Sequence, residues 1–157
     1  MSNPRTSHID VLSSSKQAIH CQVKCNILNK NICISFIYGS NDAQERMQLW
    51  NELQHISQMN HLPWLLMGDF NVVASIMERK SSCPPRMNDI VEFSNIVYKL
   101  GIADMAAVGP LFTWSNNQDA KDRVWVKLDR VMIDTNWIRQ GIQSGVVFLE
   151  PGIFVIL

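Results

Sequence analysis

The first third of the chain shows a pattern of apolar and polar positions that predicts two strands. Residues 17–25 (QAIHCQVKC) alternate between apolar and polar side chains, which is typical of a half-exposed strand. Residues 32–39 (ICISFIYG) are more continuously apolar, and a polar turn at 28–31 separates the two runs. Strands joined by so short a turn predict an antiparallel hairpin. Residues 1–10 are mostly polar and are expected to form a frayed lead-in.

A helical pattern follows at residues 43–59 (AQERMQLWNELQHISQM), preceded by Ser, Asn and Asp, which favour helix N-caps. Its apolar residues form one stripe, made of Met47, Leu49, Trp50, Leu53 and Ile56. After the break HLP, residues 64–71 (WLLMGDFN) predict a buried strand. A strand, a helix and a strand in this order indicate a βαβ unit or its antiparallel relative.

The second half of the chain continues the mixed pattern. Residues 74–88 are loop-like, and residues 88–101 predict an amphipathic helix that ends at Gly101. Three β-rich runs then follow, at residues 111–116, 122–134 and 144–150. A short helix or turn at 135–141 precedes the last of them. Mixed strands with helices between them favour a layered α+β sandwich.

Composition places the chain among single-domain globular proteins. It has 157 residues, 46% of them hydrophobic and 18% charged, so disorder is excluded. The 14 basic and 14 acidic side chains cancel, so any contact with nucleic acid must be local. No apolar run is long enough for a membrane span, and no secretory leader is recognisable. The four cysteines have no CxxC spacing, which favours reduced thiols inside the cell over a zinc site.

The stretch GDFN carries the first candidate chemistry. Gly68 permits a tight backbone turn, and Asp69 follows directly at the carboxyl end of the predicted strand, where α/β sheets bind ligands. Asn71 projects to the same side if the strand continues. A carboxylate beside an amide can activate a water molecule and stabilise a charged oxygen. The simpler alternative is an Asx-turn, in which both side chains only bond their own backbone.

Other motifs, taken in order, add to this site. They are SFIYGSN, RMQLWNEL, PWLLMGDFN, GPLFTWSN and RVWVKLDRVMID. Together they resemble the endonuclease/exonuclease/phosphatase family, above all the endonuclease region of plant non-LTR (LINE-type) retrotransposon polyproteins. The resemblance runs from about Val11 to Ile153. It implies a four-layered α/β/β/α sandwich of the DNase I-like type, present here as one incomplete domain over residues 1–157.

The resemblance also implies an activity, the hydrolysis of phosphodiesters with a divalent metal such as Mg²⁺ and DNA as the partner. By motif, Asp69 matches the aspartate that orients or deprotonates the attacking water, and Asn71 the asparagine that contacts the scissile phosphate. Tyr38 matches the tyrosine near that phosphate, and Asp129 the aspartate that orients a catalytic histidine. No membrane or small-molecule cofactor is implied, the oligomeric state stays open, and the expected location is inside the cell, in the nucleus by resemblance only.

Each of these residues has a simpler alternative. Tyr38 could cap an apolar strand with its hydroxyl in water. Asp129 could form a surface ion pair with Arg130 or Arg123. In FTWSN, Trp114 and Asn116 could stack on and bond a nucleotide, although a tryptophan in an alternating strand is more often core. Arg79 and Lys80 in the loop could touch a DNA backbone or simply be solvated.

Two features of the family pattern find no match. Nothing before Val11 resembles the strands that bear an asparagine and a metal-holding glutamate. The family's Ser-Asp-His motif is expected after FLEPGI, where residues 154–157 are apolar. The sequence therefore assigns no metal ligand to this chain and predicts little or no nuclease turnover. Four interpretations stay open. The chain is an inactive remnant, a working hydrolase completed by another chain or by an unusual ligand set, a non-catalytic nucleic-acid-binding module, or an unrelated α+β packing domain.

Overall fold

The computed structural model describes residues 7–150 and 153–156. Within them, the helical segments are α1 (Ala43–Met59), the 3-10 helix η1 (Ile76–Glu78), α2 (Met87–Leu100) and α3 (Thr135–Arg139). The strands are β1 (His8–Ser14), β2 (Ala18–Cys25), β3 (Lys30–Tyr38), β4 (Trp64–Asp69), β5 (Arg79–Lys80), β6 (Ile102–Asp104), β7 (Ala107–Val108), β8 (Trp114–Ser115), β9 (Trp125–Val126), β10 (Asp129–Asp134), β11 (Val146–Glu150) and β12 (Ile153–Ile156).

The main sheet has the strand order β1-β2-β3-β4-β10-β6. The predicted hairpin is confirmed, because β2 and β3 pair antiparallel, with Ala18 opposite Ile37 at one end and Cys25 opposite Lys30 at the other. The expected frayed lead-in is wrong for residues 8–10, which pair with β2 as part of β1. All side chains of β1 are exposed, so no burial pattern marked it as a strand in the sequence. Residues 1–6 of that lead-in lie outside the described part of the chain.

The strand–helix–strand segment is a βαβ unit, since β3 and β4 are parallel. The Asp42 carboxylate caps α1 by accepting from the Glu45 amide at 2.9 Å. The buried face of α1 holds Leu49 and Trp50 as expected, but Met47 is exposed and its neighbour Arg46 is buried instead. Further along the chain, the C-cap residue of α2 is Gly101, with a left-handed φ of 62°.

Several short elements were not expected from the sequence: η1, β5, β6, β7 and β12. Most of them lie within or beside segments that looked like loops, because two or three residues are too few to show a period. The predicted run 122–134 divides into β9 and β10, which belong to different sheets. Of the predicted run 111–116, only two residues form a strand, paired with β9.

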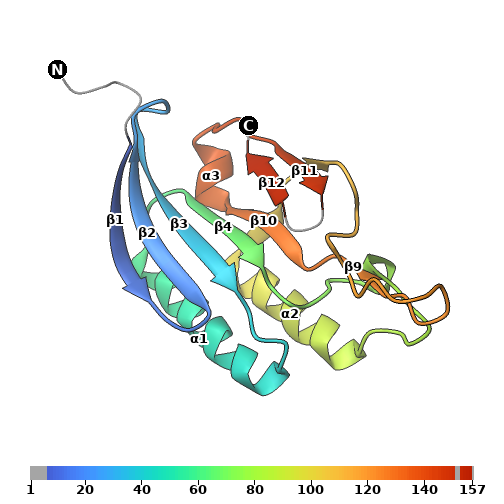
Figure 1. Cartoon of the computed structure of the whole chain (residues 1–157). Coiled ribbons are helices and arrows are strands. Elements are labelled where there is room, and N and C mark those ends of the chain that lie inside the picture. The colour runs from blue at the N-terminus through green and yellow to red at the C-terminus, as the bar shows by residue number, and fades with distance from the viewer. Residues whose placement is uncertain (1–6, 151–152, 157) are drawn as a thin grey trace.

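The elements form layers around the main sheet (Figure 1). Helices α1 and α2 lie on one face, over a core that includes Trp50, Trp64, Phe70 and Phe93. On the other face, a small sheet of order β12-β11-β7 and the helix α3 bury a second core around Trp137. The expected layered α+β architecture is thus confirmed. In the described part of the chain, no helix is long and apolar enough to cross a bilayer.

Candidate active site

Three of the candidate residues meet on adjacent strands of the main sheet. Tyr38 ends β3 and pairs in register with Asp69, which ends the parallel strand β4. On the other side of β4, Asp129 begins the antiparallel strand β10 and lies directly opposite Asp69. Directly opposed residues place their side chains on the same face of a sheet, with Cβ atoms about 5 Å apart. The sheet therefore brings together carboxylates that are 60 positions apart in the sequence.

A tight turn after Asp69 places Asn71. Asn71 has a left-handed φ of 53°, and its amide N–H donates to the Asp69 carboxylate at 2.7 Å. This is the Asx-turn that was the simpler alternative, so the Asp69 carboxylate has a local structural role. The Asn71 side chain also bonds outward, donating through Nδ2 to the carbonyl of Gly39 at 3.0 Å. The turn is thus fastened to the loop that follows Tyr38.

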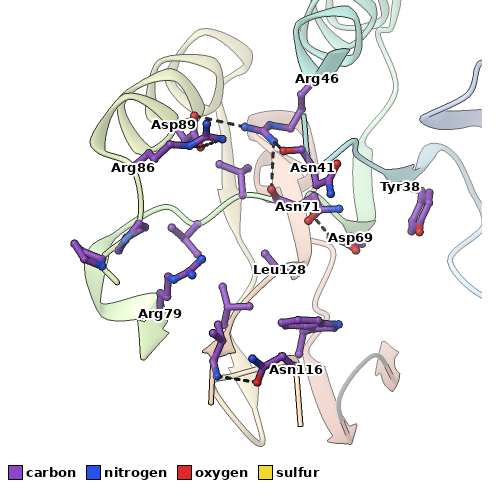
Figure 2. A pocket seen from close by; sticks show the side chains of 17 residues that line it. Tyr38, Asn41, Arg46, Asp69, Asn71, Arg79, Arg86, Asp89, Asn116 and Leu128 are labelled. Atoms are coloured by element: carbon purple, nitrogen blue, oxygen red, sulfur yellow. Dashed lines mark hydrogen bonds and ion pairs between the residues drawn. The ribbon is translucent and has the colours of Figure 1, made fainter. Parts of the chain in front are cut away.

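Two hollows open around these residues, of about 690 and 630 Å³. Tyr38, Asp69 and Trp114 line both of them, so the hollows adjoin at the end of β4. The larger one is shown in Figure 2, and its polar lining includes Asn41, Arg46, Asn71, Arg79, Arg86, Asp89 and Asn116. The smaller one is lined by Thr113, Trp125 and Asp129, among others. All seven candidate site residues line at least one hollow.

The candidate substrate-contacting residues come from the small sheet β5-β9-β8. Trp114 is 46% exposed, so it is not a core residue. The Asn116 side chain donates to the Asp122 carbonyl at 2.8 Å and accepts from the Val124 amide at 2.9 Å. Its amide thus holds the β8–β9 hairpin together and has less capacity left for a ligand.

The structure leaves the simpler alternative open for Tyr38, a strand cap, but not for Asp129, a surface ion pair. Tyr38 is 71% exposed, which is compatible both with a plain cap and with access to a substrate. Asp129 is not paired with either suggested arginine. Arg130 bonds Glu78 and Asp104, and Arg123 donates to a backbone carbonyl. A surface ion pair therefore does not account for Asp129.

Burial raises the pKa of both opposed carboxyls above its ordinary value. For Asp69, the hydrogen bond from the Asn71 amide opposes this effect, and the negative charge of Asp129 adds to it. For Asp129, a hydrogen bond with the Thr113 hydroxyl opposes it. A carboxylate with a raised pKa is a better base, which is what activation of water requires.

These shifts predict how stability depends on pH. A carboxyl whose pKa is raised in the folded state stabilises the fold fully below its ordinary pKa of 3.8, and this contribution is lost as the pH rises through the folded pKa. Asp129→Asn removes the charge but can still accept from Thr113. We therefore expect its melting temperature at pH 8 to equal or exceed that of the parent chain, with a smaller difference at pH 4. Thermal unfolding followed by circular dichroism measures this. A clearly lower melting temperature at pH 8 would contradict it.

Three further residues of the site were not singled out from the sequence. Asn41 lies in the larger hollow, three residues after Tyr38. Thr113 accepts from the amides of Leu128 and Asp129, at 3.0 Å each, and so fixes the start of β10. Arg46 is buried under the hollow although it belongs to a surface helix. All three lie within the quoted motifs SFIYGSN, RMQLWNEL and GPLFTWSN, but the motifs alone gave them no role.

The donor set can be compared with the needs of Mg²⁺, which binds oxygen ligands and often uses one or two carboxylates, waters and substrate phosphates. Asp69 and Asp129 provide two carboxylates with raised pKa values, which a nearby cation would lower. Among the described residues, no group of three or more His, Cys, Asp or Glu side chains is arranged to hold a metal. The residues present therefore fit a water-rich, two-carboxylate site and not a complete protein cage.

Comparisons with known proteins place this geometry in a family. The sequence model of the endonuclease/exonuclease/phosphatase family matches residues 4–151. No curated protein matches the chain significantly. Among solved structures, the endonuclease domain of TRAS1, a telomere-specific non-LTR retrotransposon, matches with a TM-score of 0.63 at 12% identity, over 83% of this chain and 58% of that one.

Two other structures share the fold. Sphingomyelinase C from Streptomyces griseocarneus has a TM-score of 0.54 at 11% identity, over 88% of this chain and 53% of that one. D. rerio TDP2 with 14 humanizing mutations has a TM-score of 0.51 at 14% identity, over 92% of this chain and 57% of that one. The chain thus spans a little over half of each of these structures. Since the family model covers nearly the whole sequence, the chain belongs to the endonuclease/exonuclease/phosphatase family.

Proposed function

We propose that the chain carries the Asp69–Asn71 part of a DNA phosphodiesterase site of retroelement type, with a plant element as its source. The observation that carries this proposal is the convergence of Tyr38, Asp69, Asn71 and Asp129 where two hollows adjoin. The fold match to a retrotransposon endonuclease domain supports the choice of DNA. Such a protein would act inside the cell, in the nucleus.

The roles follow from the contacts. Asp69, with its raised pKa, orients and accepts a proton from the attacking water. The Asn71 amide has one N–H left after its bond to the Gly39 carbonyl and can donate it to a phosphate oxygen. Tyr38 lies at the open side and contacts the sugar–phosphate backbone. Asp69 and Asp129 would hold a Mg²⁺ ion, which would supply charge neutralisation of the phosphate.

We further propose that this chain by itself turns over slowly. None of the histidines lines either hollow in the described part of the chain. His20, for example, is buried between Ser35 and Glu52 in the main core. Without an imidazole among the described residues of either hollow, little stabilises the charge that develops on the phosphate. The loss of one such stabilising group costs about 10²- to 10³-fold in other enzymes.

DNA binding tests the proposed site. Asn71→Asp keeps the shape of the side chain but replaces an amide donor by a negative charge beside Asp69. We expect it to weaken binding of a short duplex by at least about tenfold, or about 1.4 kcal/mol. Asn29→Asp is the matched control, because Asn29 also has a left-handed φ, of 49°, but lies in the β2–β3 turn. Fluorescence anisotropy measures both, and equal effects of the two substitutions would refute the site.

Plasmid nicking tests the turnover. With Mg²⁺, we expect the parent chain to nick supercoiled DNA no faster than its Asp69→Asn variant. The reason is that both have no imidazole, among the described residues that line the hollows, to stabilise the charge that develops on the phosphate. Metal-dependent nicking that Asp69→Asn abolishes would contradict the slow-turnover proposal and support a working hydrolase. Duplex binding without metal-dependent nicking is the result that this proposal expects.

A further inference from the structure

Arg46 has hydrogen-bond donors that the protein leaves unused. Its side chain is 1% exposed, and Nη1 donates to the carbonyl of Ser40 at 2.9 Å and more weakly to those of Asn41 and Asn71. Its Nε and Nη2 atoms are buried without any hydrogen-bond partner. Buried donors of this kind are rare in folded proteins, and leaving them unsatisfied costs free energy. An acceptor that reached Nη2 would therefore be bound favourably.

The nearest anion to these donors is the carboxylate of Asp89. Its Oδ1 lies 3.9 Å from Arg46 Nη2, which is too far for a hydrogen bond. Its Oδ2 lies 3.0 Å from both Nε and Nη2 of Arg86. Asp89 is thus held by the exposed Arg86 and reaches only part of the way to the buried Arg46 (Figure 2).

The first turn of α2 adds to the attraction for anions at this place. Helix α2 has 14 residues, and no side chain caps its N-terminus. The free amides and the dipole of a helix N-terminus favour negative charge. Arg79 lines the same hollow, which extends to Asp69 and Asn71. One continuous hollow is therefore lined by three arginines and two aspartates: Arg46, Arg79, Arg86, Asp69 and Asp89.

We propose that Arg46, Arg86 and the first turn of α2 form a second phosphate subsite, which the Asp89 carboxylate occupies in the free protein. This inference rests on the proposed function, and its ligand is a backbone phosphodiester next to the one at Asp69 and Asn71. The N–H groups of a guanidinium are spaced to donate two parallel hydrogen bonds to two oxygens of one phosphate. A phosphate can therefore bond the guanidiniums of both Arg46 and Arg86, whereas the Asp89 carboxylate bonds only that of Arg86. On binding, Asp89 swings outward and the phosphate completes the hydrogen bonding of Arg46.

The experiment measures duplex affinity by anisotropy at two salt concentrations. Asp89→Asn removes the competing charge with little change in shape, and we expect binding about three- to tenfold tighter. Arg86→Gln removes an exposed contact, and we expect binding about three- to tenfold weaker, with a salt slope lower by about one. The control is Arg139→Gln, because Arg139 is exposed on α3, on the opposite face of the main sheet. We expect it to change neither quantity.

A second measurement does not depend on DNA. The Arg46 Nε–H signal in ¹⁵N NMR spectra should shift on titration with inorganic phosphate, and at lower phosphate concentration in Asp89→Asn. An unchanged or weaker duplex affinity of Asp89→Asn, or an Arg46 signal that neither phosphate nor DNA moves, would overturn the subsite.

The two proposals can fail separately. If Asn71→Asp weakens DNA binding while Asp89→Asn and Arg86→Gln have no effect, the proposed function stands and the subsite is wrong. If phosphate moves the Arg46 signal but the parent chain binds no duplex, the subsite binds free phosphate and the assignment to DNA is wrong.

Discussion

Gly68→Ala is expected to destabilise the protein by more than about 3 kcal/mol, a large share of the total stability of a domain. Gly68 has φ 130°, a conformation that L-residues rarely adopt. A Cβ atom there would lie 2.1 Å from the carbonyl oxygen of Ile37. That oxygen belongs to β3, in the middle of the main sheet, so it cannot move without breaking the ladder between β3 and β4. Urea unfolding measures the loss.

The matched control for this substitution is Gly141→Ala. Gly141 also has a positive φ, of 64°, but a Cβ atom added there would meet no other atom within 4 Å. We expect it to cost only about 1–2 kcal/mol, the strain of a left-handed backbone. The difference between the two variants reports the close approach of β3 and β4, which also sets Asp69 beside Tyr38, together with the greater backbone strain of φ 130°. Equal losses of unfolding free energy in the two variants would show that β3 and β4 lie farther apart at Gly68 than in the structure.

Arg130→Met is expected to cost about 3–5 kcal/mol, because it leaves the largely buried carboxylate of Glu78 without its ion-pair partner. The Arg130 side chain is 0% exposed and bonds Asp104 at 2.7 Å and both carboxylate oxygens of Glu78. Its guanidinium also lies 5.2 Å from the ring centre of Phe93. By contrast, the pair of Arg86 and Asp89, in which the Arg86 side chain is 70% exposed, is worth only about 1 kcal/mol. Arg86→Gln is therefore the matched control in the same unfolding assay.

The pH dependence distinguishes a lost ion pair from lost packing. Burial raises the pKa of Glu78, but the hydrogen bond and charge of Arg130 outweigh it and hold that pKa below its ordinary value of 4.5. Glu78 thus stabilises the fold above pH 4.5, and this contribution is lost as the pH falls through the lower folded pKa. In Arg130→Met this acid-induced loss should disappear, and adding Glu78→Gln should recover part of the stability at pH 7. A double variant as unstable as the single one would point to packing alone.

The regular elements could be predicted because their periods are long enough to read. Helix α1 was expected at residues 43–59 and has these bounds. The β2–β3 hairpin, the end of α2 at Gly101 and the buried strand β4 were predicted in the same way. In each case, local propensity and the burial of one face agree.

The edge strand β1 was missed because its side chains are exposed, so only backbone pairing makes it a strand. The same holds for the short strands β5 and β7, whose pairing depends on where other segments lie. No local pattern encodes such partners. The burial of Arg46 also depends on the loop before α1, because its guanidinium bonds the carbonyl of Ser40.

The sequence by itself determined the types of residue at the site, since GDFN, the tyrosine before Asn41 and the aspartate of KLDRV can be read from their motifs. The tertiary structure alone decided that Asp69 and Asp129 face each other on adjacent strands and that burial raises the pKa of both. It also decided that a buried Arg46 lines the same hollow as Asp69. The reason is physical. Side-chain chemistry is local to a residue, whereas desolvation, opposition of charges and unsatisfied donors depend on which distant segments pack around it.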